Sequence, residues 1–173
     1  MKKTQLVMLL LAFSCFLTST RGYAQASPPA TTAGKVGDAS ISIVYSSPSV
    51  KGRKIWGDLV PYGKAWRAGA NKATTFQTDK DITVEGKSLK AGKYSIFIVP
   101  TEKEWEFVFN SETGQWGIKK GSGDTNFDPA KNAITFKVKP VKSASMAEQL
   151  TYKVTDKGFV FGWENLEAHV GIK

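Results

Sequence analysis

Apolar and polar residues alternate with a period of two along most of the chain after Ala39, which is the pattern of half-buried β-strands. The alternating segments, in chain order, are Ile41–Tyr45, Trp105–Phe109, Ile134–Val138, Leu150–Val154, Phe159–Trp163 and Leu166–Ile172. No window of 12 or more residues carries an apolar stripe at helical spacing. The pattern therefore predicts an all-β fold, either an antiparallel β-sandwich or a partly open barrel.

Four further segments complete this expected order of elements. Tyr94–Val99 is apolar apart from one serine, which predicts a central strand covered on both faces. The Thr-rich run Thr74–Thr78 predicts a short strand, and Ile82–Leu89 predicts a small hairpin. Pro48–Asn71 has no strand period, so we expect a long ordered loop near the N-terminus of the folded part.

The first residues have the features of a secretory leader. Lys2 and Lys3 precede the apolar stretch Leu6–Leu17, whose 12 residues are fewer than the roughly 20 that a spanning helix needs. Cleavage after Ala24 or after Ala26 fits the small-x-small rule equally well. We therefore predict a signal peptide over residues 1–26 and export to the periplasm or the cell exterior.

The remainder of the chain divides into a linker and one domain. Ser27–Asp38 is rich in Ser, Pro, Thr, Ala and Gly, which predicts a flexible linker before a single β domain over residues 39–173. Cys15 is the single cysteine, so a processed chain has no disulfide and no thiolate. Two alternatives stay open: an uncleaved anchor, or a lipoprotein signal with Cys15 as its cysteine.

The net charge is +9, and the leader carries Lys2, Lys3 and Arg21, so the remaining chain is near +6. Its lysines are scattered, which favours anionic surfaces and solubility over nucleic-acid binding. No later apolar stretch has the length of a membrane span, and we expect no stable membrane insertion. The sequence contains no cofactor-binding motif, so we predict no cofactor, and it names no partner protein.

The candidate binding site centres on the only two arginines beyond the leader, Arg53 and Arg67. A guanidinium binds a carboxylate or phosphate with two parallel hydrogen bonds, and nearby aromatic rings can stack on a sugar. A second aromatic surface on which a ligand could stack follows a later turn, at Gln115 and Trp116. The predicted ligand-binding residues are Arg53, Trp56, Tyr62, Trp66, Arg67, Asn71, Gln115 and Trp116. The alternative is structural, with each arginine capping loop carbonyls or covering a tryptophan.

No catalytic residue and no metal ligand is predicted. The single histidine, His169, is out of phase with its apolar neighbours and should face solvent. Asp124–Asp128 resembles the start of a calcium loop, but Pro129 and Thr135 occupy the positions of its glycine and glutamate. Paired carboxylates of a glycosidase could only come from scattered acidic residues, namely Asp58, Glu102, Glu104 and Glu106.

Three long stretches of the chain read YSSPSVKGRKIWGDLVPYGKAWRAGANKATTF, LKAGKYSIFIVP and WEFVFNSETGQWG. They resemble the bacterial family known as domain of unknown function 2911. The resemblance runs from about Ser40 to the C-terminus. It implies export, as is common for this family in Bacteroidetes, and a mostly β domain, but no activity and no catalytic residue.

These observations favour an exported β-sandwich domain that binds a small anionic or saccharide ligand through an Arg/aromatic loop. Two alternatives stay open: a carboxylate-dependent envelope hydrolase, and a structural or partner-binding envelope domain.

Overall fold

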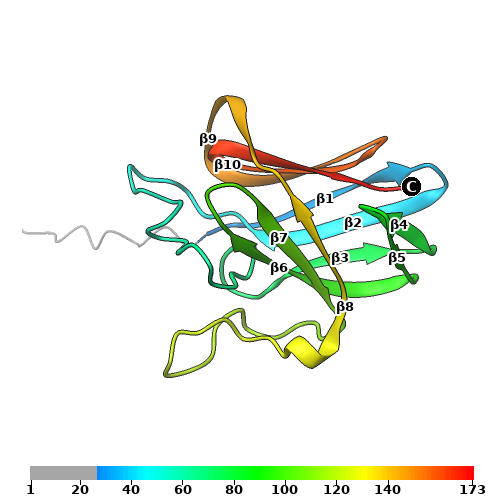
Figure 1. Cartoon of the computed structure of the whole chain (residues 1–173), viewed down its shortest axis with the longest axis horizontal. Coiled ribbons are helices and arrows are strands. Elements are labelled where there is room, and N and C mark those ends of the chain that lie inside the picture. Colours follow the sequence, from blue (N-terminus) through cyan, green and yellow to red (C-terminus); the bar gives the residue numbers. More distant parts are fainter. Residues whose placement is uncertain (1–26) are drawn as a thin grey trace, which may run out of the picture.

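The computed structural model describes residues 27–173, which form an all-β, sandwich-like fold (Figure 1). Its strands are β1 Pro29–Val36, β2 Ala39–Ser46, β3 Thr74–Thr78, β4 Ile82–Val84, β5 Lys87–Leu89, β6 Gly92–Pro100, β7 Trp105–Asn110, β8 Asn132–Val138, β9 Val141–Thr155 and β10 Gly158–Gly171. A six-stranded antiparallel sheet has the order β1-β2-β3-β6-β7-β8, and β9 and β10 form a second sheet over one of its faces. Both sheets are antiparallel, which confirms the expected all-β antiparallel class. The larger sheet is not closed into a barrel.

The core lies between the six-stranded sheet and the β9–β10 ribbon. The apolar members of the predicted alternations point into it, because successive side chains of a strand face opposite sides. The fully buried side chains include Ile41, Ile43, Phe76, Ile96, Trp105, Phe107, Phe109, Phe159, Phe161 and Trp163. The predicted hairpin is formed by β4 and β5, and it is joined to the C-terminus by reciprocal backbone hydrogen bonds between Thr83 and Lys173.

The expected flexible linker over residues 27–38 is wrong. Strand β1 pairs with β2 along its full length, from Pro29 opposite Ser46 to Val36 opposite Ala39. One of the small residues that suggested flexibility, Gly34, allows close packing against β9, since a Cβ at this position would lie 2.9 Å from Cγ1 of Val154. The signal peptide predicted over residues 1–26 lies outside the described residues.

The two C-terminal strands that were predicted separately, Phe159–Trp163 and Leu166–Ile172, are one strand, β10. Its pairing with β9 shifts between Gly162 and Glu164 and again between Glu164 and Leu166. Glu164 has a φ of 57° at this irregularity. The break in the alternation therefore marks β-bulges, which change the inward-facing positions from odd-numbered to even-numbered residues without ending the strand.

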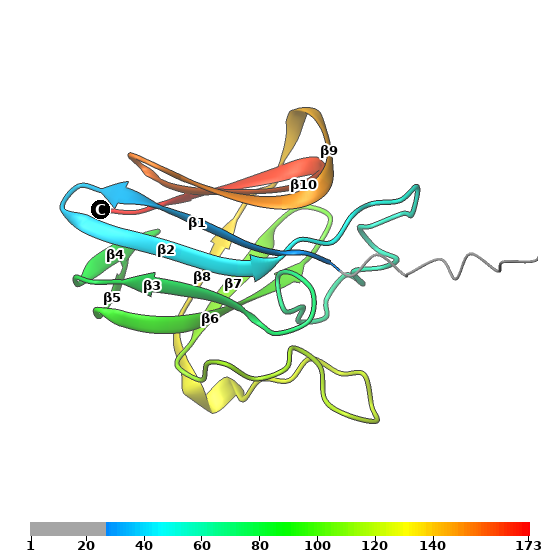
Figure 2. The same cartoon turned by 180° about the vertical axis from the view of Figure 1, so that it is seen from behind.

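The outer face of the large sheet is covered in part by residues 111–131, which we name the covering loop. In Figures 1 and 2 this loop lies on the side of the sheet opposite β9 and β10. Phe127 packs against Phe97 with ring centroids 4.8 Å apart, and Ala73 and Val108 complete this small outer cluster. Strand β6 is therefore buried on both faces, as its continuous apolar sequence predicted.

Residues 47–73, which we name the connecting loop, join β2 to β3 without regular secondary structure and are fixed by hydrogen bonds. Trp66 and Ile98 exchange backbone bonds of 2.8 and 2.9 Å, which ties this loop to β6. The buried hydroxyl of Tyr152 donates to the carbonyl of Ala68 at 2.8 Å, which ties it to β9. The expected long ordered loop is confirmed.

Within residues 27–173, no helix is long and apolar enough to cross a membrane.

Replacing Tyr152 by Phe should lower the free energy of unfolding by about 1 kcal/mol at pH 7, because a buried hydrogen bond to the connecting loop is lost. Burial raises the pKa of Tyr152 well above its usual value of 10.0. The folded protein therefore holds this proton when the unfolded chain releases it, so the contribution of Tyr152 to stability falls as the pH rises above about 10. Chemical denaturation of both proteins from pH 7 to 11 should show their stability difference shrinking at high pH.

The control for this comparison is Tyr62→Phe, which removes a hydroxyl from an exposed ring of the connecting loop. We expect its stability to match the wild type. A Tyr152→Phe variant as stable as the wild type at pH 7 would contradict the role of this hydrogen bond.

Candidate functional site

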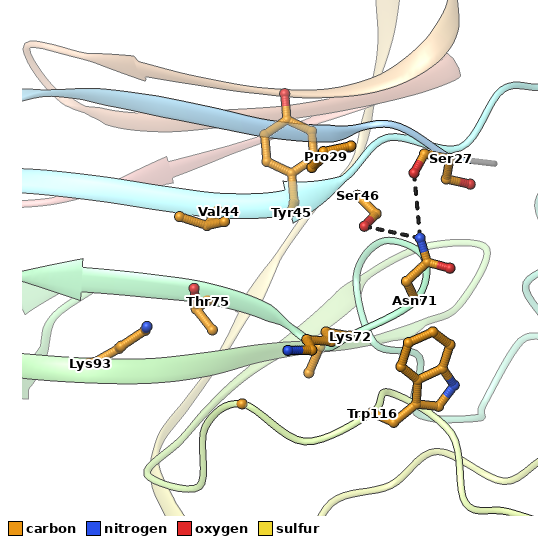
Figure 3. Close-up of a pocket in the computed structure, with 12 residues that line it drawn as sticks. Ser27, Pro29, Val44, Tyr45, Ser46, Asn71, Lys72, Thr75, Lys93 and Trp116 are labelled. Carbon is orange, nitrogen blue, oxygen red and sulfur yellow. Dashed lines mark hydrogen bonds between the residues drawn. The ribbon is translucent and has the colours of Figure 1, made fainter.

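A hollow lies on the outer face of the large sheet, beside the covering loop (Figure 3). Its volume is about 620 Å³, and we name it the Trp116 hollow. Its lining comes from residues 27–29 at the start of β1, from the end of β2, from residues 71–75 at the junction of the connecting loop and β3, from β6 and from the covering loop. Five segments that are distant in sequence therefore converge on one place.

Trp116 forms a wall of this hollow and is 51% exposed, although most large aromatic rings of the chain are buried. Its backbone is held on both sides. The residue forms a bridge with Lys72, Asn71 accepts a hydrogen bond of 3.0 Å from Gly117, and Gln115 accepts one of 3.2 Å from Ala73. Trp116 is thus a solvent-facing ring on a backbone that is tied to the start of β3.

Asn71 connects the hollow to the chain before β1. It has a φ of 60°, in the left-handed region that asparagine tolerates better than most residues. In this conformation its side-chain amide donates to the carbonyl of Ser27 at 3.4 Å and to the hydroxyl of Ser46 at 3.3 Å (Figure 3). Asn71 therefore fixes the edge of the hollow.

The charge of the hollow is positive. Lys72 and Lys93 are exposed and line it, and the lining contains no carboxylate and no histidine. Among residues 27–173, neither lysine forms an ion pair. Val44, which is 45% exposed, adds an apolar patch between these polar groups.

Arg67 lies under the covering loop beside the hollow. Its side chain packs on Gly117 so closely that a Cβ on this glycine would overlap Cδ of Arg67 and lie 2.8 Å from its Cβ. The half-buried guanidinium has its pKa lowered by desolvation, and its Nε has no hydrogen-bond partner within the described chain. Gln115 is held nearby, where it accepts from the hydroxyl of Ser95 at 3.4 Å.

Trp56 and Trp66 belong to the core at the end of the sandwich. Trp56 is 5% exposed, and its ring centroid lies 4.3 Å from that of Trp105. Trp66 stacks on Trp163 with ring centroids 5.7 Å apart. Trp56 therefore presents no ring face to solvent, and both rings serve to anchor the connecting loop.

Arg53 and Tyr62 also lie apart from the Trp116 hollow. Arg53 donates to two carbonyls of its own loop, those of Val50 and Ser49, as the structural alternative proposed. Tyr62 is 39% exposed and covers Gly57, whose Cβ position lies 2.8 Å from the tyrosine ring. The structure thus brings together Arg67, Asn71, Gln115 and Trp116, and places the other four candidates elsewhere.

Sequence reasoning missed the residues that give the hollow its charge and its apolar patch. Lys72 and Lys93 were counted among scattered lysines, because only the bridge between Lys72 and Trp116 and the pairing of β6 with β3 bring them to one hollow. Val44 is an apolar residue at an outward-facing position of β2, but a single exposed apolar side chain is common on protein surfaces and gave no signal.

The histidine and the acidic residues considered as catalytic or metal-binding groups form no cluster of metal ligands among residues 27–173 and do not line the Trp116 hollow. His169 is exposed and lies 3.0 Å from Glu167 of the same strand. Among residues 27–173, no three His, Cys, Asp or Glu side chains gather as metal ligands would.

Replacing Gly117 by Ala should destabilise the protein by about 1–3 kcal/mol, the usual effect of overpacking, because the new methyl group overlaps Arg67. The loss should be smaller in an Arg67→Ala background, and this coupling can be measured by thermal denaturation of the double-mutant cycle. The control is Gly162→Ala, whose Cβ would meet no atom closer than 3.5 Å. Equal effects of both glycine substitutions would contradict the packing of Arg67 on the covering loop.

Comparison with known proteins gives a family and no activity. No curated protein and no solved structure matched the chain. The family model described as "Protein of unknown function (DUF2911)" matches residues 27–172. This span covers nearly all described residues, including β1, which the sequence resemblance had not reached. The chain therefore belongs to the DUF2911 family of proteins of unknown function.

Proposed function

We propose that this protein is an exported binding domain that captures a saccharide carrying an anionic group in the Trp116 hollow, without chemistry. The observation that carries the proposal is a half-exposed tryptophan ring that lines the same hollow as two lysines, neither of which has a carboxylate partner within residues 27–173. The proposal narrows the small anionic or saccharide ligand expected from the sequence to a saccharide with an anionic group, and moves the centre of the site from the arginines to Trp116.

The ring of Trp116 supports a saccharide. A flat aromatic surface that is exposed on a fixed backbone offers contact area at low cost in conformational entropy. The C–H face of a sugar ring matches such a surface, and Asn71 and Ser46 offer polar groups at the edge of the same hollow. A volume of about 620 Å³ falls in the range of ligand sites.

The lysines support an anionic group on that saccharide. Lys72 and Lys93 bring two positive charges to one concave surface, where the field acts on an approaching anion before contact. Such charges are partly screened by salt, so binding should weaken as ionic strength rises.

The lining supports binding over hydrolysis. A glycosidase needs two carboxylates that face each other across the scissile bond. The Trp116 hollow is lined by no carboxylate and no imidazole. Carboxylate-dependent hydrolysis therefore has no acid and no base at this place.

Export is part of the proposal and rests on the charged and apolar leader alone. The mass of the native protein from cell fractions tests it, since removal of residues 1–26 or 1–24 is expected.

Galacturonic acid, an acidic sugar, should raise the melting temperature of the wild type at low salt. At a concentration of about 100 times the dissociation constant, a ligand adds roughly 2.7 kcal/mol, which moves the midpoint by several degrees. The shift should be absent in Trp116→Ala and reduced in the double variant Lys72→Gln/Lys93→Gln. Differential scanning fluorimetry at several ligand concentrations measures the melting temperatures of the wild type and both variants.

The matched control is Lys54→Gln/Lys153→Gln, which removes the same charge from exposed lysines outside the hollow. It should respond like the wild type. An unchanged shift in Trp116→Ala, or an equal loss in the control, would contradict the proposed site.

A further inference from the structure

A second hollow adjoins the Trp116 hollow, and Trp116 lines both. Its volume is about 600 Å³, and its other lining residues include Lys119, Lys120 and Asn126. We name it the Lys119 hollow. The exposed ring of Trp116 is therefore a shared wall between two lysine-bearing hollows.

The shape of the Lys119 hollow is fixed by a tight turn of the covering loop. Ile118 bridges Thr125, and the amide of Lys119 donates to the carbonyl of Asp124 at 2.7 Å. At the base of the turn, the side-chain amide of Asn126 donates to the carbonyl of Trp116 at 3.0 Å. These bonds hold the turn beside Trp116, so the second hollow is preorganised.

The Lys119 hollow repeats the charge of its neighbour. Lys119 and Lys120 are exposed, and within residues 27–173 neither forms an ion pair. Asp124 belongs to the same turn but does not line the hollow. Four lysines thus line the two hollows, with no carboxylate in either lining.

We infer that the ligand is an acidic oligosaccharide of several units that lies across Trp116 and occupies both hollows. This inference rests on the binding function proposed above and extends it. A single acidic sugar stacked on Trp116 in the first hollow leaves Lys119 and Lys120 without a role. A chain of such sugars repeats its carboxylates along its length and meets lysines on both sides of one aromatic wall.

The second hollow should act mainly on longer ligands. Once the first unit is bound at Trp116, the next units are held near the Lys119 hollow at a high effective concentration. Their contacts then add affinity without a second loss of translational freedom. The expected signature is a gain in affinity with chain length that depends on Lys119 and Lys120.

Isothermal titration calorimetry of the mature protein, with galacturonic acid and with tetragalacturonate, tests this inference. The wild type should bind the tetramer at least about tenfold more tightly than the monomer, which is about 1.4 kcal/mol. The variant Lys119→Gln/Lys120→Gln should bind the monomer as the wild type does and lose most of the length-dependent gain. Lys54→Gln/Lys153→Gln, with the same net charge, should keep that gain.

Three results would overturn the inference. One is equal affinity of the wild type for monomer and tetramer. Another is a Lys119→Gln/Lys120→Gln variant whose affinity rises from monomer to tetramer as much as that of the wild type. The third is equally tight binding of a single-stranded oligonucleotide of matched charge, because net charge alone would then account for the affinity. An uncharged tetrasaccharide such as xylotetraose should bind more weakly than tetragalacturonate.

The outcomes separate this inference from the function on which it rests. If neither saccharide binds the wild type, the proposed function fails together with the inference. If galacturonic acid binds through Trp116 but the tetramer gains nothing, the proposed function stands and only the extended site is refuted.

Discussion

Burial of the tryptophan cluster at one end of the sandwich is the interaction on which the rest of the structure depends. Trp56 and Trp66 of the connecting loop pack with Trp105 of β7 and Trp163 of β10, so a long irregular segment is fixed to both sheets. The indole N–H groups of Trp56, Trp105 and Trp163 are buried without hydrogen-bond partners among the described residues. Each costs about 1–3 kcal/mol. Burial of some 150–250 Å² per ring returns about 4–6 kcal/mol at roughly 25 cal/mol per Å², so packing prevails.

The candidate site follows from that anchor through a short series of contacts. The fixed connecting loop positions Arg67, on which Gly117 of the covering loop packs, and Asn71, which accepts from the amide of Gly117. Trp116 is therefore an exposed ring on a backbone that is tied to the end of the connecting loop. A rigid scaffold below and an exposed side chain above is the usual arrangement of a binding loop.

Most strands from β2 onward could be predicted, because period-two alternation depends only on which face of a strand is buried. Strand β1 and the places of individual loop side chains could not. The small residues of β1 matched a flexible linker in composition, and only the structure shows that Gly34 packs closely on Val154. Trp56 and Trp116 are both tryptophans flanked by glycine on one side, yet one fills the core and the other faces solvent. Lys72 meets Trp116 through a bridge, and Lys93 reaches the same hollow through the pairing of β6 with β3; the sequence specifies neither pairing.

The most direct test of the central claim uses the indole N–H signals of the five tryptophans in a ¹H–¹⁵N correlation spectrum. Four of these residues belong to the buried end cluster, and Trp116 alone lies in the proposed site. On titration with tetragalacturonate, the account predicts that the signal lost in a Trp116→Phe variant moves while the other four stay in place. A Trp116 signal that does not move, or equal movement of the core signals, would contradict the account.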